Sequence, residues 1–203
     1  MFNILPSSLN DDENNTRTQS CFIPNCTIDH SILTSSLASS QIFANMLSLE
    51  TSYTISHNYF HTNSSQKSPN QIDVSMRATL TTWMLEVCEE EQCTNDVFYL
   101  AVNIFDRFMC ALNKSGTQHV EKYHLQLFGI TCLFIAAKLK ANSTSMLTSL
   151  KLVDYTAHSV TISELLEWES IVLDRLKWDI AAVCPNDYLE FLLHVYAPKE
   201  VRD

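Results

Sequence analysis

Thiols and imidazoles are the side chains of this chain that are most able to hold a metal ion or to attack a substrate. The sequence contains seven cysteines and seven histidines. Two cysteine pairs, Cys21 with Cys26 and Cys88 with Cys93, are each separated by four residues. Neither pair has a second pair at the compact spacing of a structural zinc site, and the second pair crosses the end of an expected helix. We therefore expect no metal and no cofactor, and stoichiometric metal on the purified chain would overturn this.

Covalent or phosphate chemistry would need glycine-rich turns, which this sequence lacks. It has two glycines, Gly116 and Gly129. A phosphate-binding loop or a nucleophile turn uses several glycines close together, because the backbone must turn sharply and approach its ligand closely. We therefore expect that the chain is not an enzyme and that it functions by binding. Turnover by the chain alone would overturn this expectation.

Composition and charge narrow the class of partner. At 203 residues and 46% apolar, the chain is long enough for one domain with a hydrophobic core. Its formal net charge of −10 is unfavourable for binding nucleic acid or an anionic membrane surface. No apolar window approaches the ~18 residues of a membrane span, and the first residues do not resemble a secretory signal. We expect an intracellular protein with reduced thiols and with proteins as its partners.

The first 70 residues are expected to contribute little to the core. Residues 1–40 are rich in Ser, Thr and Asn, a composition typical of a disordered tail. Within residues 41–70, Ile42, Phe43, Met46 and Leu47 are spaced as one face of a short helix that can dock on a domain. A polar linker follows this short helix.

Residues 71–182 are expected to form an all-α domain. There is no proline between Asn70 and Cys184, so long helices are permitted almost throughout. Apolar residues at steps of three and four predict five helices, near 72–91, 95–112, 121–141, 145–153 and 161–177. The third is apolar almost all round, which predicts a buried central helix with Gly129 packed closely against a crossing helix. Thr161 and Glu164 have the spacing of a capping box at the start of the fifth helix.

Three segments of these helices, residues 76–83, 100–108 and 125–138, together resemble the cyclin box. Residues 83–90 and 176–182 are similar to the D-type branch of the cyclin family. The resemblance covers roughly residues 40–195 and implies a five-helix bundle around a buried third helix, as the periodicity also predicts. Most cyclins carry a second five-helix box, so residues 183–203 are expected to be the linker and start of a C-terminal box that is missing here.

The resemblance implies a surface that binds a cyclin-dependent protein kinase. In the family, a lysine and a glutamate on the third and fifth helices contact the kinase, and they match Lys138 and Glu169. Leu139 and Lys140 are expected on the same surface. Periodicity alone describes the charged pair as a solvated surface bridge. The resemblance instead implies a regulatory subunit of the nucleus and cytoplasm that activates the kinase and drives entry into DNA replication.

A second implied site is a hydrophobic patch that docks Arg-x-Leu segments of substrates and inhibitor proteins. Met76, Leu80 and Trp83 match its apolar floor, and Glu86 and Gln126 match its polar edge. Taken without the family, the three apolar residues are assigned to the core.

Arg77 and Asp106 resemble the family's internal ion pair, a structural contact between the first two helices. Retinoblastoma-type proteins are expected substrates through the kinase, although the N-terminal Leu-x-Cys-x-Glu segment common in D-type cyclins is absent. An alternative within the same fold is an adaptor that binds a kinase or transcription proteins without activating them. Reconstitution with a kinase distinguishes the two.

Overall fold

All of the regular secondary structure in the described residues is helical. The computed structural model describes residues 37–55, 58–60, 72–115, 124–140, 147–189 and 192–193, and no strand occurs in these ranges. In chain order the elements are α2 (Leu37–Glu50), η1 (Thr51–Tyr53), α3 (Val74–Glu90), α4 (Asn95–Ser115), α5 (Leu125–Lys140), α6 (Ser149–Tyr155), α7 (Ile162–Arg175) and η3 (Pro185–Tyr188). The predicted all-α class is confirmed. Most of the predicted N-terminal tail, residues 1–36, lies outside the described residues.

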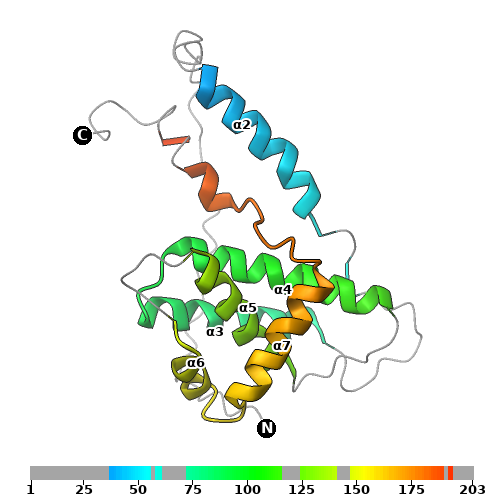
Figure 1. Cartoon of the computed structure of the whole chain (residues 1–203), viewed down its shortest axis with the longest axis vertical. Helices are drawn as coiled ribbons and strands as arrows, with labels where there is room; N and C mark the ends of the chain where they lie inside the picture. Colours follow the sequence, from blue (N-terminus) through cyan, green and yellow to red (C-terminus); the bar gives the residue numbers. More distant parts are fainter. Residues whose placement is uncertain are drawn as a thin grey trace, which may run out of the picture.

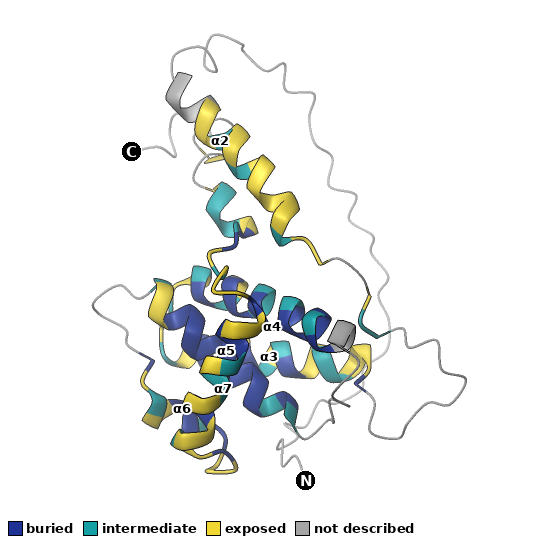
Figure 2. Ribbon diagram, turned by 45° about the vertical axis from the view of Figure 1, so that its right-hand side comes forward, coloured by how far each residue is buried: buried dark blue, intermediate teal, exposed yellow. Residues whose placement is uncertain are grey.

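Helix α5 forms the centre of the bundle. It packs against α3, α4, α6 and α7, which surround it in Figure 1. Every residue from Leu127 to Ala137 is buried, and α5 is almost entirely in the buried class in Figure 2. A helix that is apolar on all sides is stable only if neighbours cover all of those sides. The prediction of a buried central helix is confirmed.

Three helix starts differ from the sequence prediction by four residues. Helix α5, predicted from near 121, begins at Leu125. Helix α2 begins at Leu37, four residues before the predicted boundary at 41, and it is 14 residues long. Helix α6 begins at Ser149 rather than near 145, because the Thr148 side chain caps it by accepting a hydrogen bond from the backbone N–H of Lys151. Several Ser and Thr residues precede α6, and each is a possible cap by residue type, so the sequence does not identify the one that is used.

The start of α7 agrees with prediction. Thr161 Oγ1 accepts a hydrogen bond from the backbone N–H of Glu164 at 3.2 Å, and the Glu164 carboxylate accepts one from the backbone N–H of Thr161 at 2.8 Å. These reciprocal bonds form the predicted capping box. The Glu164 carboxylate also accepts a hydrogen bond from the Thr161 hydroxyl at 2.7 Å. The bond from the Thr161 backbone N–H, and then the bond from its hydroxyl, lower the pKa of the Glu164 carboxyl.

Removing this cap will destabilise the domain in a pH-dependent way. We expect Thr161→Ala to lower the free energy of unfolding by about 1 kcal/mol at pH 7. Since the folded-state pKa of Glu164 is lowered, its contribution is present above the unfolded pKa of about 4.3 and is lost as the pH falls through the folded pKa. Urea unfolding of the parent and of Thr161→Ala will therefore show a smaller difference in the free energy of unfolding at acid pH than at pH 7. Ser163→Ala, a change at an exposed residue in the same turn, is the control. If Ser163→Ala lowers the free energy of unfolding as much as Thr161→Ala does, the capping box is not the cause.

Gly129 of α5 packs directly against Leu80 of α3. A Cβ atom at this position would lie 2.8 Å from Cδ1 of Leu80, well inside normal contact distance. Leu80 is itself only 6% exposed, so its side chain has little room to move. The glycine allows α3 to pack directly on the central helix, as the sequence predicted.

We expect Gly129→Ala to destabilise the domain even though alanine favours helix by about 1 kcal/mol over glycine. The clash with Leu80 costs about 1–3 kcal/mol in a packed core and outweighs that gain. In a Leu80→Ala background the clash is absent, and the same Gly129→Ala change will then be stabilising. Denaturant unfolding of the parent, Gly129→Ala, Leu80→Ala and the double variant measures the free energy of unfolding of each. If the two changes have additive effects on this free energy, the proposed contact is wrong.

Helix α2 stands apart from the bundle in Figures 1 and 2. Its large apolar residues Ile42, Leu47 and Leu49 are 59%, 46% and 50% exposed. It meets the C-terminal segment through the ring of Phe43, whose centroid lies 5.8 Å from that of Tyr188, and through a hydrogen bond from the Tyr188 hydroxyl to Glu50. Among the described residues, no helix has the length and apolar character needed to cross a membrane.

Candidate functional site

Lys138 and Glu169 meet at the C-terminal end of the central helix. Lys138 Nζ donates hydrogen bonds to both carboxylate oxygens of Glu169, at 2.7 and 2.8 Å. The same ammonium lies 3.9 Å from the centroid of the Phe134 ring, a cation–π distance. Two residues that are 31 positions apart in the sequence are therefore held together by α5 and α7.

The two members of this pair differ in exposure. The Lys138 side chain is 49% exposed, whereas the Glu169 side chain is 14% exposed. Glu169 is thus a partly buried anchor that holds the lysine in place, and the ammonium keeps access to solvent. Because an ammonium has three N–H donors and a carboxylate has about four acceptor positions, the pair retains both a donor and an acceptor for a partner. A backbone C=O group of a partner can accept from the ammonium, and a backbone N–H group can donate to the carboxylate.

The two neighbouring residues of the predicted surface have different environments. Leu139 is 45% exposed and can add apolar contact area beside the pair. Lys140 Nζ lies 3.2 Å from Oδ1 of Asp187 in η3, and its side chain is 28% exposed. Lys140 therefore joins α5 to the C-terminal segment within the chain. Its role in binding a partner stays a prediction.

The predicted docking patch lies mainly on α3 and is largely part of the core. Leu80 is buried, and Met76 and Trp83 are partly buried and packed against the core. Glu86 is exposed, and the Gln126 side chain accepts a hydrogen bond from the Ser159 hydroxyl at 3.2 Å. The core assignment is therefore correct for Leu80, whereas Met76 and Trp83 are packed against the core and only partly buried. Whether these two partly buried residues also bind a peptide stays a prediction.

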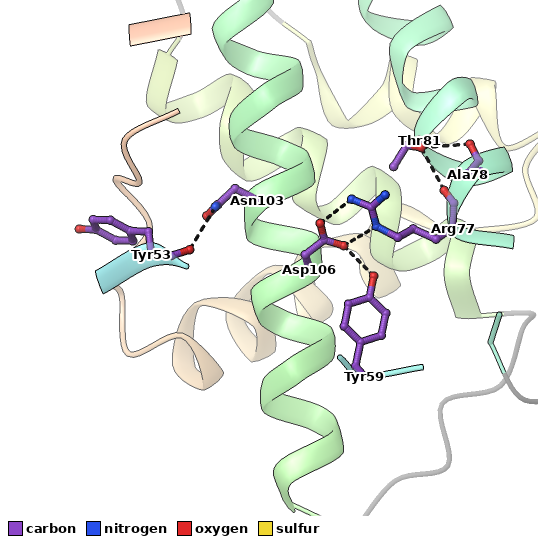
Figure 3. Close-up of polar contacts among 7 residues, drawn as sticks. All are labelled: Tyr53, Tyr59, Arg77, Ala78, Thr81, Asn103 and Asp106. Carbon is purple, nitrogen blue, oxygen red and sulfur yellow. Dashed lines mark hydrogen bonds and ion pairs between the residues drawn. The ribbon is translucent and has the colours of Figure 1, made fainter. Parts of the chain in front are cut away.

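The predicted ion pair between Arg77 and Asp106 is present and has a third member. Arg77 donates from Nε to Asp106 Oδ1 at 2.7 Å and from Nη2 to Oδ2 at 2.5 Å, and the Tyr59 hydroxyl donates to Oδ1 at 2.6 Å. Figure 3 shows the Arg77 and Tyr59 side chains converging on the Asp106 carboxylate. The Asp106 side chain is 5% exposed. The cluster therefore satisfies a buried charge and joins α3, α4 and the segment before α3.

Electrostatics in this cluster are consistent with a neutral tyrosine and a charged arginine. Burial, and then the hydrogen bond to Asp106, raise the pKa of Tyr59 above its usual value. The hydrogen bond to Asp106 is the largest of the effects that raise the pKa of Arg77. Tyr59 therefore stays neutral and Arg77 stays charged across the ordinary pH range. Sequence reasoning missed Tyr59, since it lies outside any periodic segment.

A second polar cluster was not predicted from sequence. Arg107 Nη2 donates to the backbone carbonyl of Asp179 at 2.7 Å, and its guanidinium carbon lies 4.9 Å from the centroid of the Tyr53 ring. The Tyr53 hydroxyl donates to Asp179 Oδ1 at 2.8 Å. The Tyr53 carbonyl accepts from the Asn103 side chain, and this bond is drawn in Figure 3. These contacts hold η1 and the segment after α7 against α4. The only sequence signal is that Arg107 lies in one of the cyclin-like segments.

No metal centre can be assembled from the described part of the chain. No group of three or more His, Cys, Asp or Glu side chains there has an arrangement suited to a metal ion. Cys21 and Cys26 lie outside the described residues.

The comparison with known protein families identifies the fold. Residues 41–181 match the family described as "Cyclin, N-terminal domain". The chain therefore belongs to the cyclin family. Within that family it is of the D type, since the curated proteins that match it include three kinds of G1/S-specific D-type cyclin.

The similarity to these relatives is extensive within this chain but covers only part of theirs. The chain is 43% identical to G1/S-specific cyclin-D2 of Rattus norvegicus, over 77% of this chain and 50% of the relative. It is 41% identical to cyclin-D1 of Danio rerio, over 82% and 53%, and 40% identical to cyclin-D3 of Homo sapiens, over 78% and 50%. The chain thus spans about half the length of the curated relatives it matches.

A solved structure supports the same assignment. The fold is similar to that of a viral cyclin from herpesvirus saimiri, with a TM-score of 0.58 and 28% sequence identity. The match covers 76% of this chain and 60% of the viral chain.

Proposed function

We propose that this chain is a regulatory subunit, without catalytic activity of its own, that binds and activates a cyclin-dependent protein kinase. The observation that carries the proposal is the Lys138–Glu169 pair, in which a half-exposed ammonium is held by a mostly buried carboxylate. Such a pair, beside the exposed Leu139, offers a donor, an acceptor and apolar area within one small surface. Its relatives are G1/S-specific cyclins, which supports a role at entry into DNA replication.

Activation on this proposal requires no chemistry from the chain. In an inactive kinase, the mobile helix that carries the active-site glutamate is displaced, and the lysine–glutamate pair that positions ATP is broken. Lys138 and Glu169 would bind backbone groups of that helix only when it is in its inward position. The chain then shifts the kinase population toward the active form, by as much as its affinity for the two forms differs.

Met76 and Trp83, which are partly buried, are proposed to dock substrates and inhibitor proteins together with the neighbouring Leu80 of the same helix. Burying one leucine side chain against such a surface contributes about 1.5–3 kcal/mol, which suits exchangeable docking. Retinoblastoma-type proteins are the proposed substrates of the complex. We propose that the complex acts in the nucleus and cytoplasm.

Reconstitution tests the proposal. The chain is mixed with a cyclin-dependent kinase of the first gap phase, and the mixture is analysed by size-exclusion chromatography with light scattering and by phosphorylation of a retinoblastoma fragment. We expect a one-to-one complex and phosphate transfer well above that of the kinase alone. A stable complex without increased transfer would favour the non-activating adaptor, and absence of any complex across a panel of such kinases would refute the proposal.

A further inference from the structure

The turn between α3 and α4 brings two cysteines together. At the end of α3, the backbone N–H of Cys93 donates to the carbonyl of Cys88 at 2.8 Å, and the N–H of Gln92 donates to the carbonyl of Glu89 at 3.1 Å. Gln92 has a left-handed conformation with φ of 52°. These two bonds and the positive φ define a Schellman motif, in which the side chains at the positions of Cys88 and Cys93 regularly contact each other.

The thiol groups of this pair do face each other. A side-chain hydrogen bond joins Cys88 and Cys93. A disulfide needs backbones whose Cα atoms are about 4.4–6.8 Å apart and sulfurs that can approach to about 2 Å. The Schellman turn already holds the two backbones in hydrogen-bond contact. Bond formation therefore requires a small adjustment of two side chains, with no rearrangement of the helix.

The turn is fixed in place by a third helix. The Glu91 carboxylate accepts a hydrogen bond from Lys151 Nζ at 2.5 Å and one from the Tyr155 hydroxyl at 3.1 Å, both from α6. Cys93 is close enough to Tyr155 to contribute to the raised pKa of that hydroxyl, although burial has the largest effect. The thiol pair thus lies at a junction of α3, α4 and α6, where the backbone is held on both sides.

We propose that Cys88 and Cys93 form a dithiol oxidation site, at which a peroxide of the hydrogen peroxide class converts the two thiols to a reversible disulfide. The Cys93 thiolate attacks one peroxide oxygen, so that an S–O bond forms, the O–O bond breaks and hydroxide leaves as water after taking a proton. The Cys88 sulfur then loses its proton and attacks the Cys93 sulfur, so that the S–S bond forms, the S–O bond breaks and the released hydroxide takes that proton to become the second water. In total two thiols lose two hydrogens, and one peroxide is reduced to two waters.

The exposure of the two residues sets this order of attack. Cys88 is 4% exposed, and burial is the main cause that raises the pKa of its thiol to about 12. Cys93 is partly exposed and meets a dissolved oxidant first. Because the thiolate is the reactive form, a buried thiol of raised pKa is a poor first nucleophile. Cys88 therefore acts second, on an electrophilic sulfur that is already beside it.

Peptide mapping provides a direct test. Trypsin cleaves after Arg77 and Arg107, and residues 78–107 contain Cys88, Cys93 and no other cysteine, lysine or internal arginine. The folded chain is treated with hydrogen peroxide, its remaining thiols are alkylated, and the digest is analysed by mass spectrometry. We expect this peptide to lose two hydrogens, to resist alkylation and to recover both thiols after reduction. Two alkylatable thiols after treatment, or irreversible oxygen addition instead of the disulfide, would overturn the proposal.

Two variants and an unfolded control test the roles of the geometry and of each thiol. In Cys88→Ser, Cys93 will stop at the sulfenic acid, which dimedone traps, whereas in Cys93→Ser the thiol of Cys88 will remain reduced. Guanidinium-unfolded chain will form the disulfide more slowly than folded chain, since the Schellman turn is lost. An equal rate in both states, or dimedone labelling of Cys88 in Cys93→Ser, would refute the assignment. Circular dichroism checks that each variant keeps its helices.

Discussion

Replacing Arg77 with methionine will lower the free energy of unfolding by about 3–5 kcal/mol. The change removes two hydrogen bonds to the Asp106 carboxylate, whose side chain is 5% exposed, and leaves that carboxylate with the Tyr59 hydroxyl alone. A buried charge without its counter-charge carries a desolvation cost, which the remaining hydrogen bond from Tyr59 offsets only in part. Thermal unfolding followed by circular dichroism should show a midpoint lowered by about 10 °C.

Two further variants separate the cost of the unpaired charge from that of lost contacts. Tyr59→Phe removes one hydrogen bond to Asp106 and should lower the free energy of unfolding by about 1 kcal/mol. Arg77→Met combined with Asp106→Leu removes both charges, so it should be more stable than Arg77→Met alone. If the double variant is instead less stable than Arg77→Met alone, the unpaired charge of Asp106 is not the cause of the destabilisation.

Removing both Lys138 and Glu169 will abolish kinase binding at micromolar concentrations if the proposed function is correct. Charge-assisted hydrogen bonds in a water-excluded interface contribute about 1.5–3 kcal/mol each. Losing two of them weakens binding on the order of a hundredfold to ten-thousandfold. The fold should tolerate Lys138→Ala with Glu169→Ala, because an ion pair that is half exposed contributes at most about 1 kcal/mol to stability. Calorimetric titration against the kinase measures the loss, with circular dichroism as the check on folding.

A charge exchange distinguishes a binding surface from a simple surface bridge. Lys138→Glu with Glu169→Lys restores an ion pair inside the chain but reverses the positions of donor and acceptor. If the pair binds fixed backbone groups of a kinase, the exchanged variant will fold normally and still fail to bind. Recovery of affinity in the exchanged variant would show that the pair only supports the fold. Lys151→Ala, which removes a different half-exposed ion pair on α6, is the matched control and should bind as the parent does.

The elements that follow from local sequence were predicted well. The apolar residues of α5 leave no face for water, and the Thr161 and Glu164 cap depends on residues three positions apart, so both features are readable along the chain. The proximity of Lys138 and Glu169 was predicted only from the resemblance. Periodicity places each on its own helix and cannot say how two helices are rotated relative to each other.

The features that sequence reasoning missed depend on contacts between distant and irregular segments. The Tyr59 hydroxyl reaches Asp106 across 47 positions, and Tyr53 reaches Asp179 across 126. Neither tyrosine belongs to an amphipathic pattern, so nothing local marks it. Lys140 was assigned to an open surface, and its contact with Asp187 arises because η3 returns to the end of α5. Such contacts are set by the tertiary path of the chain.

The separation of α2 from the bundle sets the order in which parts of this protein exchange amide hydrogens. Helix α2 contacts η1 and Tyr188, whereas α5 is enclosed by four helices. Local opening of α2 breaks few contacts, so its amide hydrogens will exchange with deuterium long before those of α5, which are exposed only when the whole domain unfolds. A ligand or partner that covers α2 will therefore slow the amide exchange of this helix, while the exchange of the core helices stays unchanged.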